Sequence, residues 1–170
     1  MRLYKGKIEI IAEELIRLLS TNGDIELENE QEARLDVESV LKEYLRLDRE
    51  LIEEAKNRME SRGLGYSHLG QMRNQIAKER GFPTSEEVLP YLLEQILYIL
   101  FHSNNVLEIF ATDTELRKKT TQVLRKHMDM DTELDREVRS KIKNLQEGTT
   151  TFDIEYAKVM KQIKERRRLS

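Results

Sequence analysis

The stretch Ala33–Met59, ARLDVESVLKEYLRLDRELIEEAKNRM, decides the fold of this 170-residue chain. Its apolar side chains recur every three or four residues, which places them on one face of an α-helix. These positions are Val37, Val40, Tyr44, Leu47, Leu51, Ala55 and Met59. No glycine or proline follows before Gly63, so the stretch predicts one continuous helix of about seven turns. The alternative is a break at Asp48, since aspartate is a residue type that caps new helices.

Shorter elements flank this stretch. Apolar residues at helical spacing from Ile8 predict a first amphipathic helix that stops at Asn22-Gly23. Residues 24–28 then alternate briefly, as a very short strand or an extended connector does. After the long helix, a glycine-rich turn is expected, with Gly63 in a left-handed C-cap and Ser67 as the N-cap of a short helix.

The second half of the chain repeats this pattern. LKEYLRLDREL at Leu41–Leu51 returns as LRKHMDMDTEL at Leu124–Leu134. The apolar positions of the long helix also return at the same spacing, in Leu116, Thr120, Val123, His127, Met130, Leu134, Val138 and Ile142. A second long helix is therefore expected. Its continuity at Asp131 is the same open question as the continuity of the first helix at Asp48.

The duplication predicts an all-α fold with two tandem pseudo-symmetric repeats in an elongated helical bundle. Each repeat has the order helix, short extended link, long helix, turn and short helix. The first repeat covers residues 1–80, a linker covers 81–85, and the second repeat covers 86–170. Because each copy alone offers a small set of apolar residues, the two repeats are expected to share one composite core.

Composition supports a helical protein outside the membrane. Charged residues make up 36% of the chain, well above the usual quarter or so, as in proteins with many exposed helix faces. There is no cysteine, which excludes disulfides and cysteine-based catalysis or zinc binding and fits a cytoplasmic location. The net charge of -3 gives no global attraction to nucleic acid or to anionic membranes. Glu94 and Gln95 split the most apolar stretch, 88–101, which is too short to span a membrane.

Three stretches resemble a known family. They are MRLYKGKI at Met1–Ile8, IELE at Ile25–Glu28, and DREVRSKI at Asp135–Ile142, which Glu147-Gly148 follows. On these stretches, and over essentially its whole length, the chain resembles the bacterial proteins grouped as domain of unknown function 507. The resemblance implies a small helical bacterial protein. It provides no activity, cofactor or catalytic residue to transfer to this sequence.

No motif has catalytic or metal-binding spacing. The acidic run Asp129, Asp131, Glu133, Asp135 and Glu137 resembles the start of a calcium loop. However, Leu134 stands where that loop needs glycine and Ser140 stands where it needs a bidentate glutamate. A solvated helix face or a helix start is therefore expected for these carboxylates. The histidines, His68, His102 and His127, include no pair at the i,i+4 spacing of helical zinc sites, so no cofactor is predicted.

The C-terminal segment carries a candidate basic patch that only Glu165 opposes: Lys158, Lys161, Lys164, Arg166, Arg167 and Arg168. Basic residues at a helix end are expected in any case, because they interact favourably with the negative end of the helix dipole. Three consecutive arginines exceed that need. The patch therefore predicts either a solvated tail or a contact with nucleic-acid phosphates or an acidic protein. No aromatic residue interleaves with it, so stacking on bases is not predicted.

The stretch 88–101 is apolar on most of its circumference, which predicts a helix at the centre of the fold. Part of that surface can instead close a homodimer or receive a partner. The candidate partner or dimer surface consists of Tyr91, Leu92, Tyr98 and Phe101.

These features together predict a non-enzymatic protein-protein interaction or scaffolding protein that acts through its duplicated long amphipathic helices. A protein partner or self-association is expected, and no membrane contact. The alternative is a nucleic-acid-associated protein that uses the basic C-terminal helix. The two functions differ in a measurable way, since nucleic-acid binding falls steeply with salt concentration.

Overall fold

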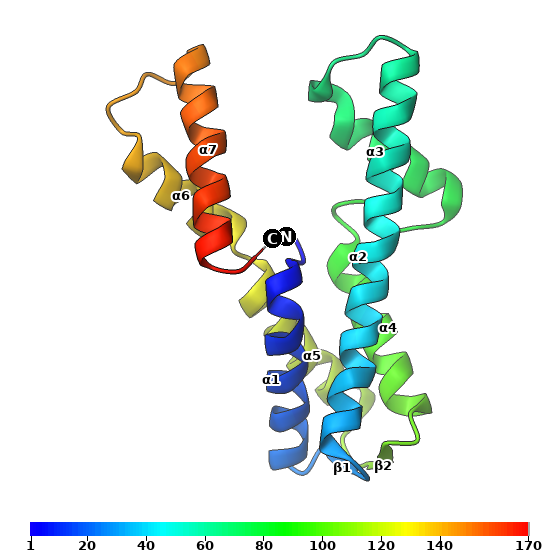
Figure 1. Ribbon diagram of the computed structural model, residues 1–170. Coiled ribbons are helices and arrows are strands. Elements are labelled where there is room, and N and C mark those ends of the chain that lie inside the picture. The colour runs from blue at the N-terminus through cyan, green and yellow to red at the C-terminus, as the bar shows by residue number, and fades with distance from the viewer. Residues whose placement is uncertain (170) are drawn as a thin grey trace.

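The computed structural model describes residues 1–169, apart from the side chains of Tyr66, Asp131 and Thr132. Ser170, the last residue of the predicted second repeat, lies outside the described residues. The chain forms a fork of helices with two arms above a common body, and its two termini lie side by side where the arms separate (Figure 1). The prediction of an elongated all-α fold is confirmed.

The elements follow one another in a helix-strand-helix order that occurs in both halves. They are α1 (Ile8–Thr21), β1 (Ile25–Leu27), α2 (Glu30–Ser61), α3 (Leu69–Arg80), α4 (Val88–His102), β2 (Val106–Ile109), α5 (Asp113–Met128), α6 (Asp131–Lys141) and α7 (Thr150–Arg166). Single 3₁₀ turns, Lys5–Lys7 and Tyr66–His68, precede α1 and α3. The body contains α1, the first half of α2, α4 and α5. We call the second half of α2 with α3 the first arm, and α6 with α7 the second arm (Figure 1).

The helix α2 is continuous through Asp48, as the apolar periodicity predicts. It begins after Asn29, whose side-chain oxygen accepts a hydrogen bond from the Glu32 amide at 3.0 Å. Gly63 has a φ of +65°, so the predicted left-handed C-cap is confirmed. Ser67 is not the next N-cap, because it lies inside a 3₁₀ turn and α3 begins at Leu69 with His68 as its N-cap residue.

The expectation of a second long helix is wrong, because α5 ends at Met128 and α6 begins at Asp131. Between them, Asp129 has backbone angles outside the helical range, φ -86° and ψ 53°. The Met128 carbonyl accepts a hydrogen bond from the Arg2 amide at 3.3 Å. In an uninterrupted helix that carbonyl would pair with the amide four residues on. The N-terminal segment therefore caps the end of α5.

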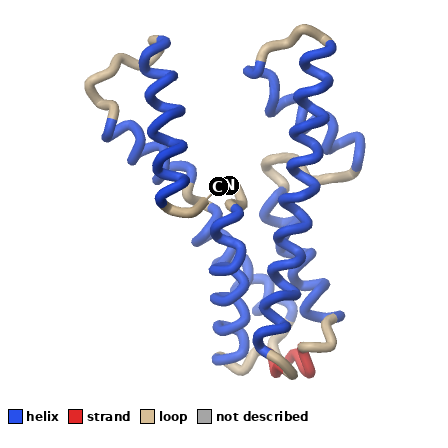
Figure 2. Tube along the Cα trace, viewed as in Figure 1, coloured by secondary structure: helices blue, strands red, loops and turns tan. Residues whose placement is uncertain are grey.

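The extended links of the two halves pair as a two-stranded antiparallel sheet at the end of the body farthest from the arms (Figure 2). Glu26 lies opposite Glu108, Ile25 opposite Ile109 and Leu27 opposite Val106, with a register shift after Glu26. This pairing joins the first half of the chain directly to the second.

Three groups of buried side chains stabilise the fork. The largest lies in the body and draws residues from α1, α2, α4 and α5. A second lies inside the second arm and includes Tyr4 and Leu169 from the two termini. A third lies inside the first arm, between the end of α2 and α3. The division into two repeats joined at 81–85 remains a prediction, and in the structure residues 81–87 connect α3 to α4.

No helix within residues 1–169 combines the length and the apolar character that a membrane crossing requires.

Candidate functional site

The four residues of the predicted partner surface lie on two different faces of α4, one buried and one exposed. Leu92 is 0% exposed, so it belongs to the core and cannot contribute to a surface. Tyr91 is half-buried, and its ring packs near those of Phe82 and Tyr44, at centroid distances of 5.6 and 6.0 Å. The prediction of a central helix therefore describes this face of α4.

Tyr98 and Phe101 lie on the opposite, solvent-facing side of α4 and are 62% and 53% exposed. The Tyr98 ring stacks on the His102 ring at a centroid distance of 4.0 Å. On the adjoining strand and its exit, Leu107 is 55% exposed and Phe110 is 64% exposed. We call Tyr98, Phe101, Leu107 and Phe110 the α4–β2 apolar surface.

A groove between α4 and α5 runs beside this surface, with Tyr98, Phe101 and His102 in its lining. Charged residues form its other side. Arg117 donates to Asp113 at 2.6 Å and also pairs with Glu94 across to α4. The hydrogen bond from Arg117 lowers the pKa of Glu94 and outweighs the opposing effects of burial and of Asp113, so that carboxylate stays ionised well below neutral pH. The groove thus has an apolar wall and a fixed polar rim.

The predicted basic patch does not form one exposed row. Arg167 donates to Glu133 at 3.0 Å and also pairs with Glu137, which Arg166 contacts as well. Lys164 lies over the ring of Tyr4, at 5.4 Å from its centroid. Lys158, Lys161 and Arg168 are exposed. Half of the patch is therefore engaged in holding the second arm together.

The same contacts account for most of the acidic run. Glu133 and Glu137 pair with arginines of the C-terminal segment, and Asp135 accepts a hydrogen bond from the Tyr156 hydroxyl at 2.6 Å. That bond is the main reason why the pKa of Asp135 lies below its ordinary value. The side chain of Asp131 lies outside the described residues. Within the described part of the chain, no three histidine, aspartate or glutamate side chains converge as metal ligands.

A groove lined by basic residues lies where the arms separate, with a volume of about 700 Å³. It takes lining residues from the N-terminal turn, the middle of α2 and the end of α7. Its charged residues are Lys5, Glu9, Lys42, Arg46, Arg49, Arg167 and Arg168. We call it the fork groove. Sequence reasoning identified only Arg167 and Arg168, because the other residues lie more than a hundred positions away in the chain.

The two termini form one side of the fork groove. A Cβ atom added to Gly6 would lie 1.1 Å from the carbonyl oxygen of Arg168, so the backbones touch and only glycine fits. Tyr4 and Leu169 are 3% and 2% exposed and pack into the core of the second arm. We call Tyr4, Gly6, Arg168 and Leu169 the terminal clasp.

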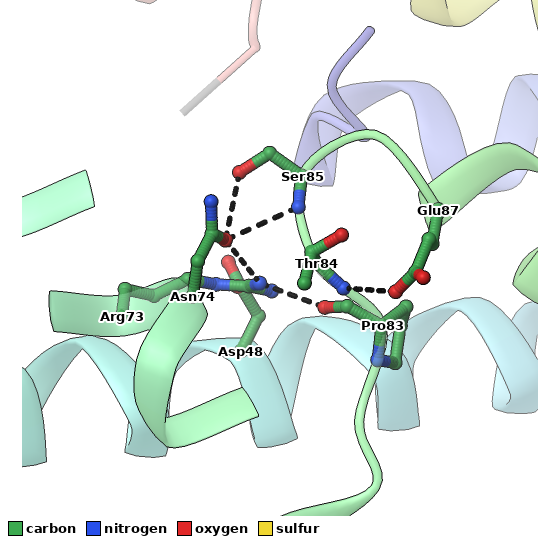
Figure 3. A network of polar contacts seen from close by, with 7 residues as sticks. All are labelled: Asp48, Arg73, Asn74, Pro83, Thr84, Ser85 and Glu87. Carbon is green, nitrogen blue, oxygen red and sulfur yellow. Dashed lines mark hydrogen bonds and ion pairs between the residues drawn. The ribbon is translucent and has the colours of Figure 1, made fainter. Parts of the chain in front are cut away.

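Arg73 is the centre of a polar network that joins α2, α3 and the following loop (Figure 3). Its guanidinium donates to Asp48 at 2.6 and 2.9 Å and to the Pro83 carbonyl at 2.7 Å. Asn74 accepts from Arg73 and from the Ser85 amide, both at 3.2 Å. Each guanidinium nitrogen thus has a partner within the protein. The network has a structural role, although Asp48 and Arg73 also line a cleft beside the N-terminus.

Tyr44 connects this network to the body. Its ring stacks on the Phe82 ring at a centroid distance of 5.4 Å, and the Arg73 guanidinium lies over the same Phe82 ring, at 5.5 Å from its centroid. Burial raises the pKa of the Tyr44 hydroxyl to about 12, and the nearby Asp48 carboxylate adds to the shift. The hydroxyl is therefore neutral at physiological pH.

His127 lies at the edge of the body core and is 7% exposed. Its Nε2 atom hydrogen-bonds to Glu14, which also accepts from Lys126 at 2.6 Å. Burial raises the pKa of Glu14, but the contacts with His127 and Lys126 outweigh this and leave it below the ordinary value. The pair joins α5 to α1 and has no third group that would complete a catalytic arrangement among the contacts of the described residues.

The search of curated proteins finds no match to the chain. The sequence model of a family described as "Protein of unknown function (DUF507)" matches residues 1–169. That match covers almost the whole chain and confirms the resemblance seen in Met1–Ile8 and Asp135–Ile142. The chain therefore belongs to the DUF507 family, whose function is unknown.

Proposed function

We propose that this protein is a non-enzymatic protein-binding protein and that the α4–β2 apolar surface contacts a protein partner. One observation carries the proposal: Tyr98, Phe101, Leu107 and Phe110 are each more than half exposed within a stretch of thirteen residues. Single exposed apolar side chains are common, but clustered aromatic ones mark interaction sites. The ion-paired rim of Glu94, Arg117 and Asp113 supports the proposal, since interfaces combine an apolar centre with a polar edge.

The first half of the chain offers a comparison within the molecule. When Glu94 is aligned with Glu13, Tyr98 corresponds to Arg17 and Phe101 corresponds to Ser20. Arg17 pairs with Glu13 at 2.6 Å, and both replacements are polar. The fold itself therefore does not require aromatic residues at these positions. Their presence on α4 alone supports a binding role in the second half.

We also propose that the two halves arose by internal duplication, which would explain a scaffold with two related arms. Corresponding ion pairs support this: Arg34 lies 3.9 Å from Glu13, and Arg117 pairs with Glu94. Glu26 and Glu108, which are equivalent when residues 22–27 are aligned with residues 104–109, lie opposite each other in the sheet. A pseudo-two-fold axis through that pair would relate α1 to α4 and α2 to α5.

The test is a native affinity purification of the tagged protein from its own host, followed by mass spectrometry. Wild type, Phe101→Asp and Ile154→Asp are compared. Ile154 is the matched control because it is 61% exposed but lies on α7. The proposal expects a protein that survives nuclease treatment, is lost from Phe101→Asp and is kept by Ile154→Asp. Equal recovery of all proteins by the three forms would contradict it.

The same experiment tests the alternative of nucleic-acid association. One observation favours it: among the described residues, Lys158, Lys161 and Arg168 of the basic patch have no ion pair. If nuclease removes every partner and Phe101→Asp changes nothing, the basic residues are the better candidates. A homodimer would be recognised by recovery of untagged protein with the tagged form, again in a manner sensitive to Phe101.

A further inference from the structure

The fork groove carries more positive charge than the protein itself neutralises. Three of its six cations have carboxylate partners: Lys42 with Glu38 at 3.2 Å, Arg46 with Glu43 at 2.7 Å, and Arg167 with Glu133 at 3.0 Å. Within residues 1–169, the other three, Lys5, Arg49 and Arg168, have no ion pair. They lie on three separate parts of the chain: the N-terminal turn, α2 and the segment that follows α7.

The charge balance of the unpaired groups indicates the kind of ligand. Glu9 is the one carboxylate in the groove lining, and against Lys5, Arg49 and Arg168 it leaves two uncompensated positive charges. A phosphate monoester carries a charge of about -1.5 to -2 at neutral pH and has three strong acceptor oxygens. Lysine and arginine together provide the donors that such a group prefers.

The backbone conformation of Arg168 also supports a functional role for this residue. Its φ of +55° makes it the one non-glycine residue of the described chain in the left-handed region. At the equivalent helix-end position, α1 and α3 have Gly23 and Gly81. A non-glycine residue there costs about 1 kcal/mol or more, and such strain is often found at functional sites. The arginine side chain is thus kept at the groove although glycine would fit the backbone better.

The start of α1 makes a weaker contribution to the positive potential of the fork groove. Gly6, Ile8 and Glu9 line the groove, and the N-cap residue Lys7 makes no side-chain capping bond. The preceding 3₁₀ turn already uses the amides of Lys7 and Ile8, which donate to the carbonyls of Tyr4 and Lys5. The contribution is therefore that of the helix dipole, whose positive end attracts anions. This places the positive end of a 14-residue helix beside the three unpaired cations.

From these observations together we propose that the fork groove binds a small molecule that carries a phosphate dianion, held between Lys5, Arg49 and Arg168. The volume of about 700 Å³ fits a small phosphorylated ligand. The groove lining contains no aromatic residue, so recognition rests on the phosphate and not on stacking of a base. Because the lining comes from the body and from α7, the bound ligand also joins the second arm to the body.

The experiment measures binding by isothermal titration calorimetry, with pyrophosphate and inorganic phosphate as probes and chloride as the background anion. Arg49→Ala and Lys5→Ala should each weaken pyrophosphate binding about tenfold or more, as expected for loss of a charged hydrogen bond. Lys143→Ala is the matched control. Lys143 is exposed in the loop between α6 and α7, at the other end of the second arm, and its loss should leave the affinity unchanged.

Arg168→Gly separates binding from folding. Glycine relieves the strained backbone, so the free protein should melt at a higher temperature than wild type, while pyrophosphate binding should weaken about tenfold or more. Absence of pyrophosphate and phosphate binding in the wild type would overturn the proposal. Equal weakening by Lys143→Ala would also overturn it, since the attraction would then be general. Failure of the Phe101→Asp test would not affect these measurements, because that surface lies at the other end of the body.

Discussion

The two arms of the fork have related sequence patterns but are attached to the body in different ways. The first arm continues the body, because α2 passes from one to the other without a break. The second arm begins with a new helix after Asp129 and is held by the terminal clasp. α6 and α7 pack mainly against each other, whereas α2 packs against α1, α3 and α4. A shared apolar periodicity thus fixes which faces are buried but does not fix how an arm is joined.

Proline in the middle of α2 should have the largest effect on this comparison. Leu47→Pro removes a helical hydrogen bond and creates a steric clash, which costs about 3 kcal/mol or more and should abolish the cooperative fold. Asp129→Gly, at the joint of the second arm, should cost less than about 1 kcal/mol because its backbone is already non-helical. Circular dichroism and thermal unfolding measure both variants. Equal melting of the two would show that continuity of α2 does not matter.

Loss of Arg73 should have the next largest effect. Arg73→Met removes the bonds to Asp48 and Pro83 and should lower the free energy of unfolding by about 2–3 kcal/mol, since it breaks a largely buried ion pair. Urea denaturation measures the loss. Arg136→Met, an exposed arginine of α6, serves as the control and should change the stability by less than about 0.5 kcal/mol. A similar loss in both variants would show that the network around Arg73 stabilises the protein no more than an exposed arginine does.

The terminal clasp predicts a smaller effect confined to the second arm. Gly6→Ala places a methyl group against the Arg168 carbonyl and should cost about 1–3 kcal/mol, as overpacking does. Hydrogen exchange should become faster in α6 and α7 and stay unchanged in α3. Gly65→Ala is the control, because a Cβ there meets nothing within 4 Å. Faster exchange throughout the protein would indicate that the clasp stabilises the whole fold.

The smallest expected effect concerns Tyr44 and the dependence of the free energy of unfolding on pH. Its folded pKa of about 12 lies above the ordinary value of 10.0, so its stabilising contribution is complete below pH 10.0 and is lost as the pH rises toward 12. At pH 11 the wild type should have lost about 1 kcal/mol relative to Tyr44→Phe. Denaturant unfolding at pH 9 and pH 11 measures the difference between the two proteins. An identical pH response would place the hydroxyl in contact with water.

The sequence predicts the helices whose boundaries depend on local residues. The periodicity from Val37 to Met59 gave α2, and Gly63 gave its end. The sequence could not predict the break after Met128, because the apolar spacing continues through that position. The hydrogen bond that caps the Met128 carbonyl comes from the amide of Arg2, at the far end of the chain.

The same distinction applies to the surfaces. An apolar helix such as α4 is expected to be central, but the pattern alone does not tell that Leu92 faces the core and Phe101 faces the solvent. The fork groove could not be predicted, since Lys5, Arg49 and Arg168 meet only in the folded chain. Folding also determines which charged residues pair. Arg166 and Arg167, predicted as part of an interface, form ion pairs within the second arm.

The most direct test of the comparison between the arms is a distance measurement by pulsed electron spin resonance. The chain has no cysteine, so spin labels can be attached to introduced cysteines without background. A label at Glu28, at the end of the body farthest from the arms, is paired with one at Glu60 in the first arm or with one at Lys143 in the second arm. We predict a narrow distance distribution for the first pair, and a broader one for the second pair that Gly6→Ala broadens further. Two distributions of equal width, both unaffected by Gly6→Ala, would contradict the account.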